Sequence, residues 1–146
     1  MTTLDRRMTE EAQIRAVIDE RAEALRTKNA GGVIRHHAPD FVLFSLAPPL
    51  VSRTDPRDLE AWLATWRGPI GYEIRALTIA AGGDVAFCHS LNRMTGTKRD
   101  GEATELWFRQ TLGLRKTAAG WKITHAHESV PFHMDGSLKA ATDLAP

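Results

Sequence analysis

The stretch WFRQTLGLRKTAAGWKITHAHESV, residues 107–130, contains two segments in which apolar and polar residues alternate. A period of two is typical of β-strands, because successive side chains along a strand point to opposite faces of the sheet. The short segment Ala118-Ala119-Gly120 between them has the composition of a hairpin turn. The stretch therefore predicts two antiparallel strands that pair with each other.

The register of this hairpin depends on the length of its loop. A three-residue loop over 118–120 places Thr111 opposite His127, whereas a four-residue loop places Gln110 there and moves Arg109 to the other sheet face. Glycine at the last loop position fits a bulge turn and favours the three-residue form. That form predicts a polar strip on one sheet face. Its members are Arg109, Thr111, His125, His127 and Ser129.

The remainder of the chain predicts helices first and strands afterwards. Thr9 is a plausible N-cap of the first helix, and Asp55 followed by Pro56 is typical of the start of another. The order predicts a single α+β domain over 1–146, in which a curved antiparallel or mixed sheet wraps around about three N-terminal helices. An early strand is expected to join one sheet edge. The predicted segments are helices at 9–28 and 33–38, a strand at 41–46, a helix from Asp55 to before Gly68, and strands at 72–81, 85–96, 103–116 and 121–130.

Composition narrows the class of protein. Hydrophobic residues make up 42% of the chain and charged residues 25%, a balance typical of globular proteins. The 19 basic and 18 acidic residues form no basic block, so nucleic acid is not an expected partner. The longest apolar runs, such as FVLF at 41–44, are too short to span a membrane, and the N-terminus has no apolar run typical of a secretory signal. The lone Cys88 excludes an intrachain disulfide and reads as a small buried residue, and the expected location is cytoplasmic.

Four segments resemble the SnoaL-like branch of the ketosteroid isomerase and nuclear transport factor 2 superfamily. They are GPIGYEIRALTI (68–79), DVAFCHSLNRMTGT (84–97), WFRQTLGLRK (107–116) and WKITHAHESVPF (121–132). The resemblance covers roughly residues 10–146 and implies a cone with a pocket at its open end. It also implies a homodimer through the outer sheet face. It does not select a function, because this superfamily contains isomerases, cyclases, dehydratases, hydrolases and pure binding or assembly domains.

The first functional hypothesis is a small-molecule-binding protein with a partly apolar pocket, which could act as an isomerase, cyclase or hydratase. In it, Arg109 anchors a polar group of the ligand and His127 donates or accepts a proton, so these two are the candidate catalytic residues. No residue pattern requires a cofactor. Further candidate ligand contacts are Trp107, Tyr72, His89, Thr111, His125, Ser129, Trp62 and Trp66.

Other interpretations of the same residues stay open. A non-catalytic homodimeric module would use the polar strip for assembly, with Arg109 paired to a carboxylate. His125 and His127 could share a metal only with a third ligand, for which His89 and Glu105 are equal candidates, so no metal is predicted. The helical spacing of Trp62 and Trp66 favours core packing over ligand contact.

The resemblance also places the family's functional positions on this chain. The catalytic aspartate of the ketosteroid isomerases aligns with Ser45, so their proton-transfer chemistry is not predicted here. The family's usual acidic residue between the two histidines is Ala126 in this chain, and Glu128 follows them instead. His36 and His37 are predicted to lie in a short surface helix and to be solvated.

Overall fold

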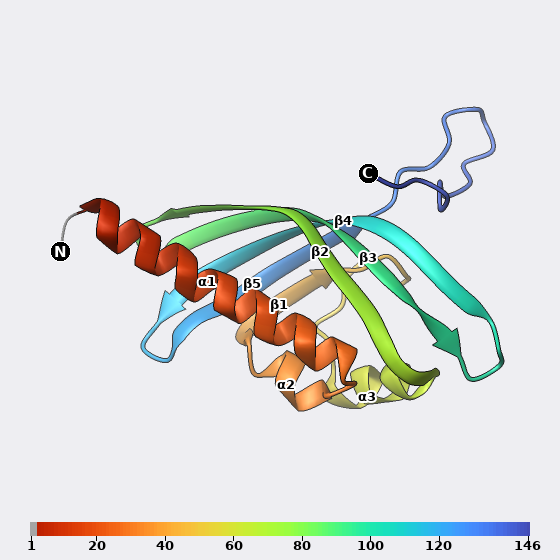
Figure 1. The fold of residues 1–146 in the computed structure, drawn as a ribbon, viewed down its shortest axis with the longest axis horizontal. Helices are drawn as coiled ribbons and strands as arrows, with labels where there is room; N and C mark the ends of the chain where they lie inside the picture. Colours follow the sequence, from red (N-terminus) through yellow and green to blue (C-terminus); the bar gives the residue numbers. More distant parts are fainter. Residues whose placement is uncertain (1–2) are drawn as a thin grey trace.

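In the computed structural model, which describes residues 3–146 and the side chains from Thr9 onward, three helices and five strands form one α+β unit. Figure 1 shows the curved sheet arching over α1, with α2 and α3 beneath one end of it. This arrangement confirms the predicted cone. The elements are α1 (Thr3–Arg26), α2 (Ala30–Ile34), β1 (His37–Phe44), α3 (Pro56–Ala64), β2 (Trp66–Gly82), β3 (Val85–Lys98), β4 (Ala103–Thr117) and β5 (Gly120–Ser129).

The five strands form one sheet in the order β1-β5-β4-β3-β2. The strands β2 to β5 pair antiparallel with their sequence neighbours, whereas β1 pairs with β5 in parallel. The early strand therefore joins the sheet edge as predicted, and the sheet is mixed. Among the described residues, no helix is long and apolar enough to cross a membrane.

The predicted register between β4 and β5 is confirmed, although the predicted loop is not. Thr111 pairs with His127 and Arg109 pairs with Ser129. The loop has only two residues, because Thr117 already pairs with Gly120, whose φ is +100°.

A register shift further along the hairpin compensates for the loop being one residue shorter than predicted. Leu114 pairs with Ile123 while Gly113 pairs with His125, so the register skips Thr124, whose Oγ1 donates to the Gly113 carbonyl oxygen at 3.2 Å. One extra residue on β5 restores the register that the longer loop would have given.

Two helices, α1 and α2, begin earlier than predicted, whereas the predicted cap of α3 is correct. Helix α1 begins at Thr3, so Thr9 lies inside the helix and the predicted N-cap is wrong. Helix α2 begins three residues earlier than predicted, because the Asn29 side chain accepts a hydrogen bond from the backbone N–H of Gly32. The Asp55 cap of α3 is confirmed, since its side chain accepts from the N–H of Arg57.

Helix α2 ends at Ile34, so His36 and His37 do not lie in the predicted surface helix. His37 is the first residue of β1, and His36 is only 5% exposed, beside Glu20 of α1 at 3.2 Å between Nε2 and Oε2. The prediction that both are solvated is therefore wrong. Strand β2 likewise begins at Trp66, earlier than the predicted start at Tyr72.

The main core lies between α1 and the inner face of the sheet. Ile14 and Ile18 of α1 pack with Leu112 of β4 and Ile123 of β5, and Cys88 is buried among them. Burying an aliphatic side chain of this size stabilises the fold by about 1.5–3 kcal/mol. A second cluster, around the buried Trp66 of β2, packs Ala30 of α2 and Leu63 of α3 against the start of β2.

We expect Gly96→Ala to destabilise the fold, because Gly96 of β3 lies directly against the Trp66 ring. A Cβ on this residue would lie 2.8 Å from Cε3 and 2.9 Å from Cζ3 of the indole. Relieving that clash requires a shift of packed atoms, and the free energy of unfolding should fall by about 1–3 kcal/mol in urea titrations. Gly82→Ala at the end of β2, where a Cβ meets nothing within 4 Å, is the matched control and should change it little. Equal losses in both variants would contradict this packing.

Candidate functional site

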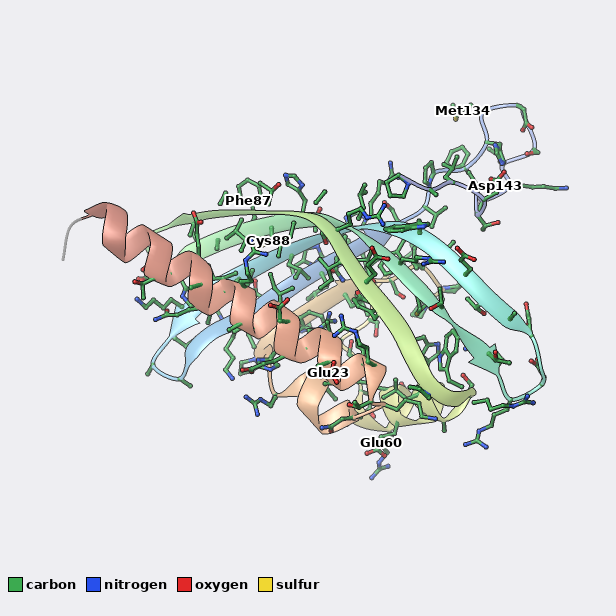
Figure 2. The ribbon with its side chains drawn as sticks, viewed as in Figure 1. Glu23, Glu60, Phe87, Cys88, Met134 and Asp143 are labelled. Carbon is green, nitrogen blue, oxygen red and sulfur yellow. The ribbon has the colours of Figure 1, made fainter. Side chains whose placement is uncertain are left out.

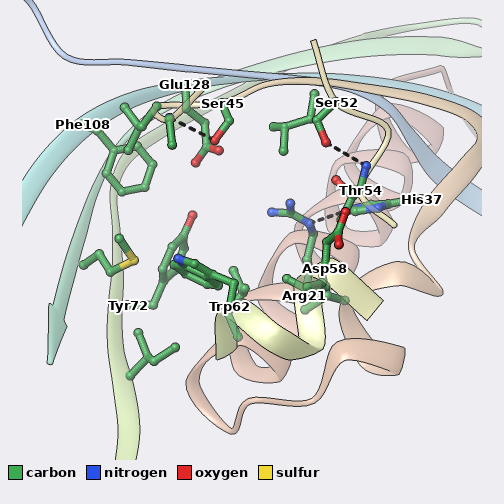
Figure 3. Close-up of a pocket in the computed structure, with 18 of the residues that line it drawn as sticks. Arg21, His37, Ser45, Ser52, Thr54, Asp58, Trp62, Tyr72, Phe108 and Glu128 are labelled. Atoms are coloured by element: carbon green, nitrogen blue, oxygen red, sulfur yellow. Dashed lines mark hydrogen bonds between the residues drawn. The ribbon is translucent and has the colours of Figure 1, made fainter. Parts of the chain in front are cut away.

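A cavity of about 420 Å³ lies between the inner sheet face and the helices. Helices α1 and α3, strand β1 and the segment 45–55 close its other sides, as the close-up in Figure 3 shows. A volume of this size suits a small organic molecule. The walls are mostly apolar, formed by Leu25, Val33, Leu43, Leu46, Ala47, Leu59, Trp62, Ile70, Met94, Leu106 and Phe108.

Polar side chains enter this cavity from two sides. Figure 3 shows Tyr72 and Glu128 on one side, with Arg21 and His37 across from them. Each comes from a different element, namely β2, β5, α1 and β1. The remaining polar wall is made by Ser45, Ser52, Thr54, Asp55 and Asp58.

His37 holds Arg21 in place. The Arg21 Nε donates a hydrogen bond to His37 Nε2 at 3.1 Å, and the His37 ring stacks on Phe41 with 3.8 Å between ring centroids. Burial, together with the positive charge of Arg21, lowers the pKa of His37 to about 3. His37 is therefore neutral at physiological pH, as an acceptor of this bond must be. The terminal nitrogens of Arg21 are left to point into the cavity (Figure 3).

Tyr72 is oriented by a buried chain of amides. Ser90 Oγ donates to Asn92 Oδ1 at 2.6 Å, and Asn92 Nδ2 donates to Tyr72 Oη at 2.8 Å and to Gln110 Oε1 at 3.0 Å. Gln110 Nε2 makes a longer contact to Tyr72 Oη at 3.5 Å. The Tyr72 oxygen thus accepts from the amides, which leaves its own proton for the cavity. Burial raises the pKa of Tyr72 to about 12, so this proton is retained at neutral pH.

Glu128 is the carboxyl group of the cavity that burial affects most. It pairs across the sheet with Gln110. Burial raises the pKa of Glu128, and the positive charge of Arg21 and the Gln110 hydrogen bond oppose that rise only in part. Glu128 can therefore carry a proton at a higher pH than an ordinary glutamate does.

Three of the aromatic residues predicted to contact a ligand lie on the inner side of the sheet, but only two of them reach the cavity. Tyr72 and Trp62 line it. Trp66 is buried in the core, where the Lys98 Nζ lies 3.9 Å from its ring centroid and Trp62 meets it edge-on.

The polar strip lies on the outer face of the sheet, away from the cavity. Alternation along β5 turns Ala126 and Glu128 inward and therefore His127 outward. The same alternation places Trp107 of β4 and His89 of β3 outside with the strip. The structure thus corrects the hypothesis that these residues line the cone pocket. The side chains concerned are Arg109, Thr111, His125, His127, Ser129, Trp107 and His89.

The outer strip makes its own contacts. Arg109 Nε donates to Ser129 Oγ at 3.0 Å, and the His125 Nδ1 lies 2.8 Å from the Val42 carbonyl oxygen. Phe44 packs edge-on against the rings of His125 and His127. Arg109 and His127 are not among the residues that line the cavity, and their assignment as catalytic residues stays a prediction. Within the described residues, no group of three or more histidine, cysteine or carboxylate side chains is placed to hold a metal.

Arg21, His37 and Glu128 are the cavity residues that sequence reasoning missed. Two of them had a usable signal. Glu128 follows the buried Ala126 by two residues, so alternation alone puts it on the inner face. Arg21 lies three residues after Ile18, on the face of α1 that packs on the sheet.

A curved mixed sheet wrapped over helices, with a mostly apolar cavity beneath it, defines the class as cone-shaped α+β domains. The sequence model of the SnoaL-like domain family matches residues 14–133, so the chain belongs to that family. The family lies within the superfamily of ketosteroid isomerase and nuclear transport factor 2. A comparison with curated proteins gave no match.

Solved structures with the same fold have diverse descriptions. An NTF2-like protein of unknown function from Pseudomonas putida KT2440 is 32% identical with a TM-score of 0.83, covering 95% of this chain and 98% of its own. A candidate ketosteroid isomerase from Shewanella frigidimarina is 26% identical with a TM-score of 0.64, covering 78% and 92%. A candidate dehydratase from Streptomyces avermitilis, 16% identical with a TM-score of 0.71 and covering 83% and 95%, shares the fold.

We expect the low pKa of His37 to make the fold acid-sensitive. Protonation of His37 is easier in the unfolded chain than in the folded one, so its contribution to stability is present above pH 6.5 and is lost as the pH falls toward about 3. His37→Gln keeps an acceptor for Arg21 but cannot protonate. As the pH falls from 6.5 toward about 3, the free energy of unfolding of the wild type should therefore decrease relative to that of this variant. The decrease should be at most about 1.4 kcal/mol per pH unit, measured by urea unfolding.

His133→Gln is the control for this measurement, because His133 is exposed in the C-terminal tail. It should follow the wild-type pH dependence. Parallel stability curves for the wild type and His37→Gln would show that His37 is not held neutral in the fold.

Proposed function

We propose that this chain binds a compact, largely apolar small molecule in the cone cavity, with the polar end of that molecule at Arg21, Tyr72 and Glu128. The observation that carries the proposal is the convergence of these three groups on a cavity whose walls are otherwise mostly apolar. Such a combination gives affinity through the walls and orientation through a few polar groups. A second hollow of about 550 Å³ lies between Phe44, the segment 45–51 and His127. His127 is the one residue of the outer strip among those that line it, so this hollow supports orientation of a ligand less well.

The same groups are suited to proton-transfer chemistry. Glu128 can exchange a proton with a bound molecule, and the Tyr72 hydroxyl can donate a hydrogen bond to an oxygen on which negative charge develops. Isomerases and dehydratases need these two functions, and two structural relatives carry those descriptions. In our proposal the general acid–base role therefore falls to Glu128 and not to His127, which lies on the other sheet face.

A fluorescence titration with 2-naphthol, a neutral aromatic probe, tests binding in the cavity. Ser45 lines the cavity and is half-buried, so the indole of Ser45→Trp would occupy space that the probe needs. We expect this variant to bind 2-naphthol at least about tenfold more weakly than the wild type, a loss of about 1.4 kcal/mol. Glu60→Trp, on the exposed side of α3, adds the same side chain outside the cavity and should bind normally. Unchanged binding by Ser45→Trp would place the probe elsewhere.

We also propose that the outer sheet face associates with a second copy of the chain. Val85 and Phe87 are 62% and 55% exposed at one end of this face, and Phe44 is 36% exposed beside the histidines. Figure 2 shows Phe87 pointing away from α1. Exposed apolar side chains gathered on one sheet face favour association. A purely structural dimer, the alternative function, would use this face and leave the cavity without a ligand.

Phe87→Glu tests this association. A charge in the middle of a buried apolar contact is unfavourable, so the variant should weaken self-association at least about tenfold in sedimentation equilibrium. Ala12→Glu, on the exposed side of α1, introduces the same carboxylate away from the sheet and should leave the oligomeric state unchanged. A monomeric wild type, or a Phe87→Glu variant that associates normally, would refute the proposed interface.

A further inference from the structure

We infer that the polar end of the ligand is a carboxylate, bound by the terminal nitrogens of Arg21 and the hydroxyl of Tyr72 while Glu128 carries a proton. The inference rests on the proposed small-molecule function and names the chemical class of the ligand. It is carried by the arrangement of hydrogen-bond donors around one end of the cavity.

Arg21 supplies the positive charge. Its Nε is already used by His37 at 3.1 Å, which fixes the plane of the guanidinium. Among the residues that the structure describes, no carboxylate forms an ion pair with Arg21. A half-buried guanidinium without a counter-ion, in a mostly apolar cavity, is a strong site for a planar anion that can accept two parallel hydrogen bonds. Carboxylate has that shape.

Tyr72 supplies a second donor from the opposite side. Asn92 Nδ2 occupies the Tyr72 oxygen at 2.8 Å, and the whole amide chain is buried, with Asn92 0% and Gln110 3% exposed. Donors that already point at the Tyr72 oxygen prevent its proton from turning inward. The O–H must then be directed to the cavity, where an anionic oxygen is its best acceptor.

Glu128 determines the charge balance of the site. As a carboxylate it would repel an anionic ligand, but as a carboxylic acid it becomes a third donor. The charged or titratable groups around it are Arg21 from α1, His37 from β1, Tyr72 from β2 and, at the exposed edge, Asp55 and Asp58 at the start of α3. His37 and Tyr72 are neutral, and water screens the two exposed aspartates. Binding of a carboxylate is therefore expected to take up one proton, and that proton goes to Glu128.

Other ligand classes use these groups less fully. A cationic amine would meet the positive Arg21 directly. A neutral carbonyl compound would satisfy Tyr72 but would leave the guanidinium without a counter-ion. A carboxylate satisfies both, which is why we commit to it.

The test compares 2-naphthoate with 2-naphthamide, which has a similar shape but no charge. We expect the wild type to bind naphthoate at least about tenfold more tightly than naphthamide. Arg21→Gln should remove that preference by weakening naphthoate, while naphthamide changes by less than about threefold. Arg15→Gln makes the same change on the exposed side of α1 and should behave like the wild type.

The outcomes of this comparison separate the two proposals. If naphthamide binds as tightly as naphthoate, or if Arg21→Gln weakens both equally, the carboxylate inference is overturned while small-molecule binding stands. If neither compound binds to the wild type, both proposals fail. Thermal unfolding of Arg21→Gln shows whether the variant is folded, and Arg21→Lys, which keeps the charge without the planar fork, should retain part of the preference.

The proton on Glu128 has its own measurement. Between about pH 5.5 and 8, where free naphthoate is ionised, the affinity of the wild type should fall as the pH rises, by at most about tenfold per unit. Glu128→Gln keeps a donor without a titrating group, so it should still bind naphthoate and should lose this pH dependence. A Glu128→Gln variant with the wild-type slope, or one whose loss of binding extends equally to naphthamide, would overturn the role of Glu128.

Discussion

The packing of α1 against the inner face of the curved sheet is the interaction on which the rest of this structure depends. At one end, Ile14 and Ile18 of the helix pack against Leu112 and Ile123 of the sheet. Toward the other end, the sheet residues that face the helix become polar and the helix presents Arg21. The apolar contact holds the helix at a fixed distance from the sheet, and the cavity is the space that this distance leaves open.

The buried polar residues of the inner sheet face are tolerated because they satisfy one another. Ser90, Asn92 and Gln110 would each destabilise an apolar core if left without partners, by about 1–3 kcal/mol per group. Their hydrogen bonds instead form one chain that ends at the Tyr72 hydroxyl. Such a chain fixes the orientation of Tyr72 before any ligand arrives, which reduces the free energy needed to order it on binding.

Much of the fold could be predicted from the sequence because the strands are long and their alternation is regular. The pairing of Arg109 with Ser129 was accessible in this way, even though a bulge at Thr124, and not the loop length, produces it. The bulge leaves no clear mark in the sequence, since its cost depends on tertiary packing. The position of His37 was missed because α2 begins at the Asn29 cap and already ends at Ile34, and competing caps cannot be ranked without the packing around them.

The candidate site was harder to predict because polar residues gather on both sheet faces. The alternating polar strip around His127 draws attention first, but in this fold the cavity lies on the same face as the apolar core. The informative residues are therefore the polar ones at apolar positions, such as Gln110 and Glu128, and not the polar face itself. The periodicity of the strands does not show which end of the inner sheet face α1 covers and which end is left for the cavity.

The two sheet faces are connected through the strands that they share. Glu128 lies between His127 and Ser129, so the backbone that presents the outer strip also positions the carboxyl group in the cavity. The same holds on β4, where Gln110 lies between Arg109 and Thr111. A partner that packs on the outer face would restrain these strands and, through them, the hydrogen bonds at Glu128 and Tyr72. Ligand binding and assembly would then be coupled by the alternation of side chains along two paired strands, without any contact between the ligand and the partner.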